Sequence, residues 1–209
     1  MAIIQLEKLR QATVVETPFP HLIVPGFVSR PLLKSINETF PAITKGGSYP
    51  IELLNDRMAV TAIIRDLESK DFEQAVSEKF GVDLSQYPKM FSLRGYTRAR
   101  DGAIHTDSKD KIVTVLLYLN ERWDEQGGRL RLLHNDHDLE NYAAEVVPDN
   151  GTLLIFLRSD RSWHGHLPFE GQRRAIQMNW MRDGNKRLSH VARHKLSSIV
   201  KRAAAAFGA

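Results

Sequence analysis

The triplet His105-Thr106-Asp107 places an imidazole and a carboxylate two residues apart near the middle of the chain. On an extended backbone these two side chains point to the same side and can reach one metal ion. The chain has eight His and 25 acidic residues, and His134-Asn135-Asp136 is a second triplet of this type. The spacing alone therefore does not distinguish half of a metal site from a polar turn.

A further imidazole for such a site comes from the stretch RSWHGHL at 161–167. A non-haem Fe(II) oxygenase site uses two imidazoles and one carboxylate, which leaves three metal positions open for a cosubstrate and oxygen. His164 and His166 face the same side of a strand, so alternation leaves both as candidates. Because the chain has no cysteine, a metal ion must be held by His and carboxylate side chains.

Two arginines follow a glycine turn in EGQRRAIQMNW, at 170–180. An arginine at the start of this strand can form a bidentate pair with a dicarboxylate cosubstrate, which a lysine would hold only as a point charge. The alternative is structural, with Arg173 and Arg174 as an ordinary edge-strand pair and Trp163 and Trp180 as core aromatics. Taken one at a time, these residues fit both interpretations.

The composition predicts an ordinary soluble globular protein. The chain of 209 residues is 42% hydrophobic and 26% charged, which suits one domain with a substantial core. It has no apolar run near the roughly 20 residues that a membrane span requires. The beginning, MAIIQLEKLRQ, has too short an apolar stretch and too many charges for a secretory signal. We therefore expect a cytoplasmic protein.

The positive charge is concentrated at the C-terminal end. Residues 182–209 hold seven Lys or Arg against one Asp, which is +6, so the other 181 residues carry −2 of the net +4. The stretch 188–209 has the apolar spacing of a helix that docks on a sheet and turns a basic face to solvent. The alternative is a contact of this helix with nucleic acid, a membrane or another partner.

The N-terminal part of the chain is predicted to be mainly helical. Prolines bound a short strand within 17–27, and Ser29 is placed to cap a helix over 30–40 that has Pro31 in its first turn. A second helix is expected over 65–80, because its apolar residues recur near the 3.6-residue period, and Gly81 should end it.

From about residue 90, short apolar runs alternate with turn residues, which predicts strands. Their spacing is typical of a jelly roll, and helices on one face would complete an α+β fold. The expected architecture is a double-stranded β-helix core with N-terminal helices packed on one sheet and a C-terminal helix. We expect one domain over 1–209, with helical support in 1–89, the core in 90–181 and the basic helix in 182–209.

Several motifs occur in a fixed order over about 91–181: IHTD, LYLNERW, GGRL, PDNGTLLIF, a late His and an Arg. In this order they resemble the 2-oxoglutarate- and Fe(II)-dependent dioxygenases, in particular the prolyl 4-hydroxylase-like group. The resemblance covers nearly half of the chain. It implies an enzyme that uses Fe(II), 2-oxoglutarate and O2, with ascorbate as an optional reductant.

By this resemblance, His105, Asp107 and His164 would be the iron ligands. The family places its carboxylate-binding residue nine to eleven positions after the distal His and six before a strand Trp. Arg174 satisfies both rules when the distal His is His164, so we expect it to anchor 2-oxoglutarate, with Arg173 as the competitor.

Three further positions match the cosubstrate pocket of the family. Tyr118 corresponds to a residue that helps hold the cosubstrate carboxylate in the hypoxia-factor prolyl hydroxylases. Leu130 and Trp180 correspond to positions that line the pocket. Since related halogenases replace the carboxylate ligand with a small residue, the presence of Asp107 favours hydroxylation.

The remaining histidines are expected to be surface residues rather than ligands. His134 and His137 lie in a polar stretch without the flanking strands that the family requires, and solvation is the usual fate of such residues. His21, His190 and His194 lie outside the region of resemblance.

The expected activity is hydroxylation of an unactivated C–H in a small-molecule or peptidyl substrate, prolyl included, with release of succinate and CO2. A basic rim suits an anionic substrate, and it is formed by Arg94, Arg98, Arg100, Lys109 and Lys111. Nucleic acid is a disfavoured substrate because no stretch combines aromatic and basic residues to read bases. The sequence leaves a homodimer open.

The rival interpretation is a non-enzymatic jelly-roll binding module. It would recruit nucleic acid or another anionic partner through the basic tail at 182–209. Such a module would bind with a steep dependence on salt and would not require iron.

Overall fold

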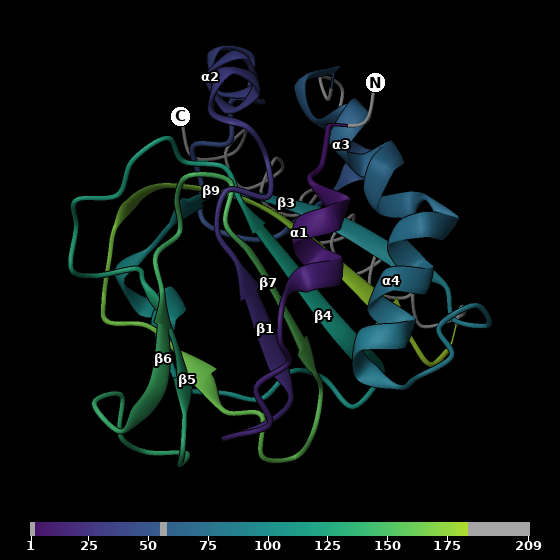
Figure 1. Ribbon diagram of the computed structural model, residues 1–209. Helices are drawn as coiled ribbons and strands as arrows, with labels where there is room; N and C mark the ends of the chain where they lie inside the picture. Colours follow the sequence, from purple (N-terminus) through teal and green to yellow (C-terminus); the bar gives the residue numbers. More distant parts are fainter. Residues whose placement is uncertain (1–2, 55–57, 184–209) are drawn as a thin grey trace.

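The computed structural model describes residues 3–54 and 58–183, and it contains two antiparallel sheets that face each other (Figure 1). The larger sheet has the strand order β1-β7-β4-β9-β3-β2, and the smaller has the order β6-β5-β8. The larger sheet consists of β1 (His21–Val24), β2 (Tyr49–Pro50), β3 (Lys89–Thr97), β4 (Lys111–Tyr118), β7 (Leu153–Leu157) and β9 (Gly171–Met181). The smaller consists of β5 (Leu130–Leu133), β6 (Tyr142–Val146) and β8 (His164–Gly165). The predicted jelly-roll fold is confirmed.

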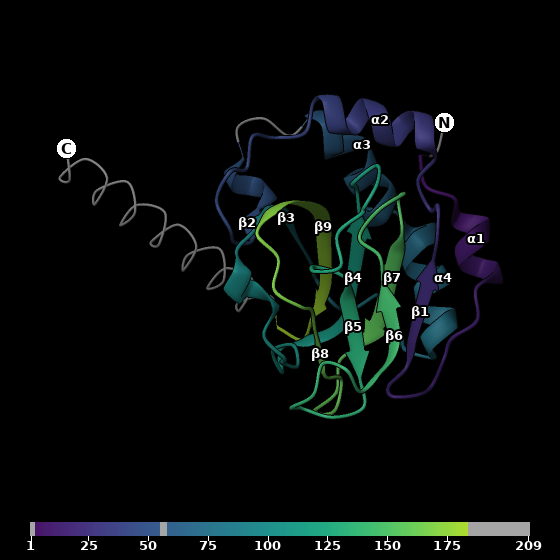
Figure 2. The same ribbon diagram turned by 90° about the vertical axis from the view of Figure 1, so that its left-hand side faces the viewer.

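Helices cover one face of the larger sheet and the smaller sheet lies on its other side, as the two views show (Figures 1 and 2). The helices are α1 (Leu6–Gln11), α2 (Arg30–Glu38), α3 (Met58–Glu68) and α4 (Lys70–Phe80), with short 3-10 turns η1 (Ile51–Leu53) and η2 (Ala99–Gly102). Since both faces of the central strands are covered, almost every residue of β4 is buried. This explains why the strand has a nearly continuous apolar sequence.

Alternation along the central strands divides the core into two clusters. Val113, Val115 and Leu117 of β4 pack toward the helices, whereas Tyr118 packs toward the smaller sheet. On β9 the division is the same, because Trp180 joins the helix-side cluster and Ala175 joins the other. The face that is turned to the smaller sheet therefore carries the even-numbered residues of β4 and the odd-numbered residues of β9.

The helix expected over 65–80 is in fact two helices that meet at Ser69. The Ser69 hydroxyl accepts a hydrogen bond from Phe72 N and donates one to Asp66 O, so this residue ends α3 and caps α4. As expected, α4 ends at Gly81, which has a left-handed φ of 63° that glycine adopts without strain.

The N-terminal third also supplies strands. β1 pairs with β7 and β2 pairs with β3, so both edge strands of the larger sheet come from before residue 89. The helical support and the core of the predicted division thus share one sheet and one hydrophobic cluster.

The predicted basic helix at 188–209 lies outside the described residues, and so do His190 and His194. Within the described parts of the chain, no helix is both long enough and apolar enough to pass through a membrane.

Candidate active site

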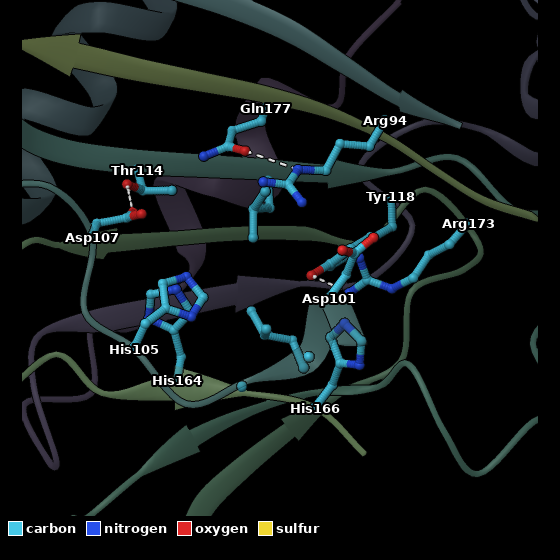
Figure 3. Close-up of a pocket in the computed structure, with 14 residues that line it drawn as sticks. Arg94, Asp101, His105, Asp107, Thr114, Tyr118, His164, His166, Arg173 and Gln177 are labelled. Atoms are coloured by element: carbon cyan, nitrogen blue, oxygen red, sulfur yellow. Dashed lines mark hydrogen bonds between the residues drawn. The ribbon is translucent and has the colours of Figure 1, made fainter. Parts of the chain in front are cut away.

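A pocket opens between the two sheets, and the side chains of η2, β3, β4, β8 and β9 that line it come from widely separated parts of the sequence (Figure 3). His105, Asp107 and His164 lie at one end. Tyr118 and Arg173 lie at the other end (Figure 3). The floor between the ends is formed by inward-facing residues of the central strands, among them Leu116 and Gln177.

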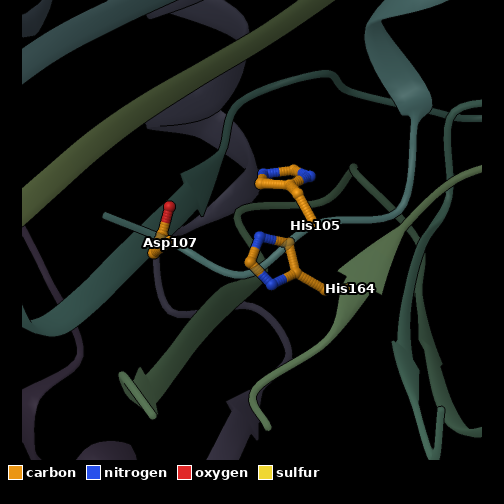
Figure 4. A group of neighbouring side chains, drawn as sticks. All are labelled: His105, Asp107 and His164. Carbon is orange, nitrogen blue, oxygen red and sulfur yellow. The ribbon is translucent and has the colours of Figure 1, made fainter. Parts of the chain in front are cut away.

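The structure brings the three predicted iron ligands together (Figure 4). The backbones of His105 and His164 form an antiparallel bridge with both N···O distances at 3.0 Å. One ligand atom from each of His105, Asp107 and His164 lies within 4.8 Å of the others. Two ligands at about 2.1 Å from one ion must lie within roughly 4 Å of each other, so a small adjustment of side chains suffices to hold one ion.

Both histidines are oriented by the backbone just before them. The Nδ1 atom of His105 is 2.8 Å from Ala103 O, and the Nδ1 atom of His164 is 2.9 Å from Ser162 O. Because a carbonyl only accepts, Nδ1 carries the proton in each ring and Nε2 keeps its lone pair for a metal. Burial lowers the pKa of His164 to about 4, so this imidazole is neutral near pH 7.

Asp107 is held in its ionised form. Lys111 Nζ is 2.7 Å from its Oδ1, and the Thr114 hydroxyl donates a hydrogen bond to its Oδ2. Burial by itself would raise the pKa of Asp107, but the charge of Lys111 and these hydrogen bonds hold that pKa well below its usual range. Two imidazoles whose Nε2 atoms are available and one ionised carboxylate are the donor set that a divalent iron ion takes.

The opposite end of the pocket is basic. Arg173 is 5% exposed, its Nε donates to Gly128 O at 2.7 Å, and its Nη2 lies 3.3 Å from the hydroxyl of Tyr118. The guanidinium also lies over the Tyr118 ring, 5.0 Å from the centroid. Leu130 lines the pocket beside this pair, as expected.

Arg174 is not in the pocket, so the preference for Arg174 over Arg173 is wrong. Its side chain lies on the other face of β9, where it donates to the side-chain oxygen of Asn37 and lies 5.3 Å from the Phe40 ring centroid. The physical reason is alternation, because consecutive residues of a strand point to opposite faces. Arg174 shares its parity with Trp180, and the face they share is the one turned away from the pocket.

Trp180 is therefore also misplaced by the sequence interpretation. It is fully buried on the helix side and stacks on Phe72 with ring centroids 6.2 Å apart. Trp180 does not line the pocket. It is a core aromatic residue, as the structural alternative for this residue stated.

His166 lines the same pocket as His164 but lies away from the three clustered ligands. Its Nδ1 is 2.8 Å from Leu167 O, and burial together with the charge of Arg173 lowers its pKa to about 4. The approach of this strand to η2 is close, since a Cβ on Gly102 would lie 2.3 Å from His166 O.

Of the five basic residues expected at the rim, only Arg94 lines the pocket. Arg98 pairs with Asp101 at 2.6 Å, and Lys111 pairs with Asp107. Arg100 and Lys109 are exposed. The expected basic rim is therefore reduced to Arg94 at the pocket, because Arg98 and Lys111 are paired and Arg100 and Lys109 do not line it.

Sequence reasoning missed six pocket residues: Asp101, Gly102, Thr114, Leu116, Gly165 and Gln177. A parity count from Tyr118 back along β4 would have found Thr114 and Leu116, because residues two and four positions away share its face.

Two other histidines of the described chain occupy ordinary surface positions. His134 and His137 are exposed, and His137 pairs with Asp136. His21 differs from the expectation of a surface residue. It is 3% exposed on β1, and its Nδ1 lies 2.8 Å from Phe19 O.

Residues 87–182 match the model of the 2OG-Fe(II) oxygenase superfamily. A comparison with curated protein sequences gives no significant match. Similar solved structures include a prolyl-4-hydroxylase of Pseudomonas putida, with a TM-score of 0.59 and 18% identity over 87% of this chain and 93% of that one. A viral collagen prolyl hydroxylase of Paramecium Bursaria Chlorella virus-1 is also similar, with a TM-score of 0.53 and 16% identity over 78% of this chain and 90% of that one.

A third similar structure is a 2OG-Fe(II) oxygenase family oxidoreductase of Burkholderia pseudomallei, with a TM-score of 0.53 and 13% identity over 78% of this chain and 84% of that one. At sequence identities this low, the likeness to these solved structures shows a shared fold and nothing beyond it. The matched segment spans β3 to β9 and includes the whole pocket. This segment belongs to the 2OG-Fe(II) oxygenase superfamily, whose members use Fe(II), 2-oxoglutarate and O2. The predicted family, the enzyme class and the use of Fe(II), 2-oxoglutarate and O2 are confirmed, whereas ascorbate stays a prediction.

Proposed function

We propose that the protein hydroxylates an unactivated C–H of a small-molecule or peptidyl substrate, with conversion of 2-oxoglutarate to succinate and CO2. The observation that carries this proposal is the layout of one pocket. It has two imidazoles and a carboxylate at one end and a buried arginine with a tyrosine at the other. A dicarboxylic acid that is bound to the metal through one end would reach the arginine with the other.

His105, Asp107 and His164 would hold the Fe(II) ion. Their donors fit the ion because both Nε2 atoms are available and the carboxylate is ionised. When bound, Fe(II) with 2-oxoglutarate and O2 supplies the oxidising chemistry, since no protein side chain can activate oxygen by itself. Lys111 and Thr114 would keep the carboxylate of Asp107 fixed while the other metal positions exchange.

Arg173 and Tyr118 would hold the distal carboxylate of 2-oxoglutarate. Gly128 O accepts from Nε of Arg173 and so fixes the direction of the guanidinium. The Tyr118 hydroxyl lies beside Nη2 of Arg173 and can donate a hydrogen bond to the same carboxylate. A charge-assisted pair of this kind is short and directional, so it would set which end of the cosubstrate faces the metal.

The class of substrate follows only in part from the likeness to prolyl hydroxylases. Two of the similar structures are prolyl hydroxylases, which supports a prolyl group as one candidate. Since a fold hosts many substrates, the proposal covers small molecules and peptides alike.

Anaerobic titration with Fe(II) and 2-oxoglutarate tests the proposal. We expect a weak visible charge-transfer band in the wild-type protein, because the cosubstrate chelates the metal. The band should be lost in His105→Ala and retained in His134→Ala, which removes an exposed histidine far from the cluster. A folded wild-type protein that gives no band would contradict the proposal. Oxygen-dependent succinate release with a panel of metabolites and peptides then identifies the substrate.

A further inference from the structure

Arg94 enters the pocket from β3, the strand next to β9. It lies opposite Ala175 in the register, and the small side chain of Ala175 leaves space above the sheet. Its Nε donates to Gln177 Oε1 at 3.1 Å (Figure 3). Gln177 lies level with Leu116 of β4, between the levels of Thr114 and Tyr118. The guanidinium is therefore placed between the metal end and the Arg173 end of the pocket.

The acidic residues of the pocket do not neutralise this arginine. Asp101 is paired with Arg98 at 2.6 Å, and Asp107 is paired with Lys111 at 2.7 Å. Among residues 3–54 and 58–183, no carboxylate lies within ion-pair distance of Arg94 or Arg173. Burial and the charge of Arg173 lower the pKa of Arg94 by more than the charges of Asp107 and Asp101 raise it. Two enclosed cations without acidic partners favour the binding of anions.

The cosubstrate accounts for only one of these two arginines. This step rests on the proposed function, in which 2-oxoglutarate places one carboxylate on the metal and the other on Arg173. The distal carboxylate of 2-oxoglutarate balances the charge of Arg173, so the charge of Arg94 remains without a partner. Gln177 occupies only Nε of Arg94, and within the described chain its two terminal nitrogens donate no hydrogen bond. They form a fork that fits one more carboxylate.

We infer that Arg94 binds a carboxylate of the primary substrate, and that the substrate is a compact carboxylic acid. The acid must be compact because Arg94 lies inside the pocket with the metal ligands. Binding of the carboxylate there would hold a nearby C–H of the same molecule toward the metal end. The amide of Gln177 would keep the guanidinium in position, so Gln177 is a positioning residue.

Acetate and its neutral analogue acetamide probe this site directly. The measurement is the relaxation rate of their methyl protons in the presence of the anaerobic protein with Fe(II) and saturating 2-oxoglutarate, because paramagnetic iron speeds relaxation only of molecules that bind nearby. In the wild-type protein we expect acetate to relax faster than acetamide. Arg94→Gln should reduce the acetate effect by about tenfold, which is typical of the loss of a charge-assisted pair. Arg94→Lys should retain part of it.

Arg100→Gln is the matched control, because it removes an exposed arginine of η2 and should behave as wild type. The melting temperature of each variant verifies folding, and Arg94→Lys keeps the test decisive if Arg94→Gln unfolds. An equal acetate effect in Arg94→Gln and wild type would overturn the inference.

The affinity for 2-oxoglutarate shows whether Arg94 binds a carboxylate of the substrate or a carboxylate of the cosubstrate. If Arg94 serves the substrate, Arg94→Gln should change the Kd for 2-oxoglutarate by less than about threefold, since no cosubstrate contact is lost. A loss of affinity as large as that of Arg173→Gln would assign Arg94 to the cosubstrate and overturn the inference. If the wild-type protein forms no charge-transfer band, the proposed function fails instead, which is a distinguishable result.

Discussion

Adjacent arginines on one strand have separate environments in this protein. Arg173 is buried beside Tyr118, whereas Arg174 contacts Asn37 of α2 and the ring of Phe40. A motif count treats the two residues as near equivalents, because their distances from His164 differ by one. The two side chains lie on opposite faces of the sheet, and only Arg173 can contact a molecule in the pocket.

The first prediction compares these two arginines. Arg173→Gln should weaken 2-oxoglutarate binding by about 10- to 100-fold, because a charged hydrogen-bond partner contributes roughly 1.5–3 kcal/mol. Arg174→Gln should leave the affinity within about twofold, since its contacts are to α2 and not to the pocket. Titration of the charge-transfer band gives both Kd values. Equal losses in the two variants would refute the assignment of Arg173.

At the scale of elements, the site depends on the close approach of η2 to β8. His166 N donates to Gly102 O at 3.0 Å, and the next contact along the two segments is the bridge between His105 and His164. A Cβ on Gly165 would lie 2.9 Å from Gly102 O. The two glycines therefore allow the segments that carry both histidines to touch.

The second prediction concerns Gly102→Ala. The new Cβ would lie 2.3 Å from His166 O and 2.5 Å from Nδ1 of that residue, so the segments must separate. We expect a loss of about 3 kcal/mol in the free energy of unfolding and weaker Fe(II) binding. Gly81→Ala is the control, because φ there is positive but nothing lies within 4 Å. It should cost about 1 kcal/mol without changing metal affinity. Urea unfolding and metal titration measure the two effects, and unchanged metal affinity in Gly102→Ala would contradict the prediction.

The third prediction concerns the turn η2 and its dependence on pH. Asp101 accepts hydrogen bonds from the backbone and side chain of Arg98. Burial would raise the pKa of Asp101, but these bonds and the charge of Arg98 outweigh it and lower that pKa. A lowered pKa in the folded state adds stability above the unfolded pKa of about 3.9, and this stability is lost as the pH falls through the folded value.

Asp101→Asn should therefore destabilise the protein at neutral pH by about 0.5–1 kcal/mol, because Arg98 is partly exposed and its pair is screened. The difference from wild type should shrink as the pH falls below about 4, because Asp101 is then protonated in the unfolded state before it is protonated in the folded state. Urea unfolding over this range measures it. A difference that does not change with pH would show that the carboxylate charge is not the cause.

The elements themselves were largely predictable, and the residues that were misjudged have identifiable causes. Apolar alternation and turn residues located the strands, and Gly81 marked the end of α4 as expected. The break at Ser69 was missed because a serine inside a helical period reads as a neutral surface residue, although its hydroxyl caps α4. Arg174 and Trp180 were misplaced because a spacing rule carries no information about which face of β9 is covered by helices.

At the scale of the whole molecule, the candidate metal ligands connect the two sheets. Asp107 lies just before β4 of the larger sheet, whereas His164 is part of β8 in the smaller sheet. An ion held by both would act as a cross-link between the layers, so its binding and the stability of the fold are linked.

The fourth prediction follows from this linkage. Fe(II) at about 100 times its Kd should add about 2.7 kcal/mol, which for a chain of this size raises the melting temperature by roughly 5–10 °C. Anaerobic thermal unfolding with Fe(II), compared with a chelator, gives the shift. His164→Ala should abolish the shift and His134→Ala should not. A shift that persists in His164→Ala would place the binding elsewhere.

The contact of Arg174 with Asn37 ties helix α2 to the strand β9, which carries Arg173 into the pocket. Asn37 also donates to Leu119 O at the end of β4, so one side chain of α2 contacts the ends of two central strands. Arg173 and Arg174 are joined by one peptide unit, so they cannot shift independently. A displacement of α2 that moves Arg174 would thus also move Arg173. A molecule that displaces α2 would therefore change the position of Arg173 without contacting the pocket.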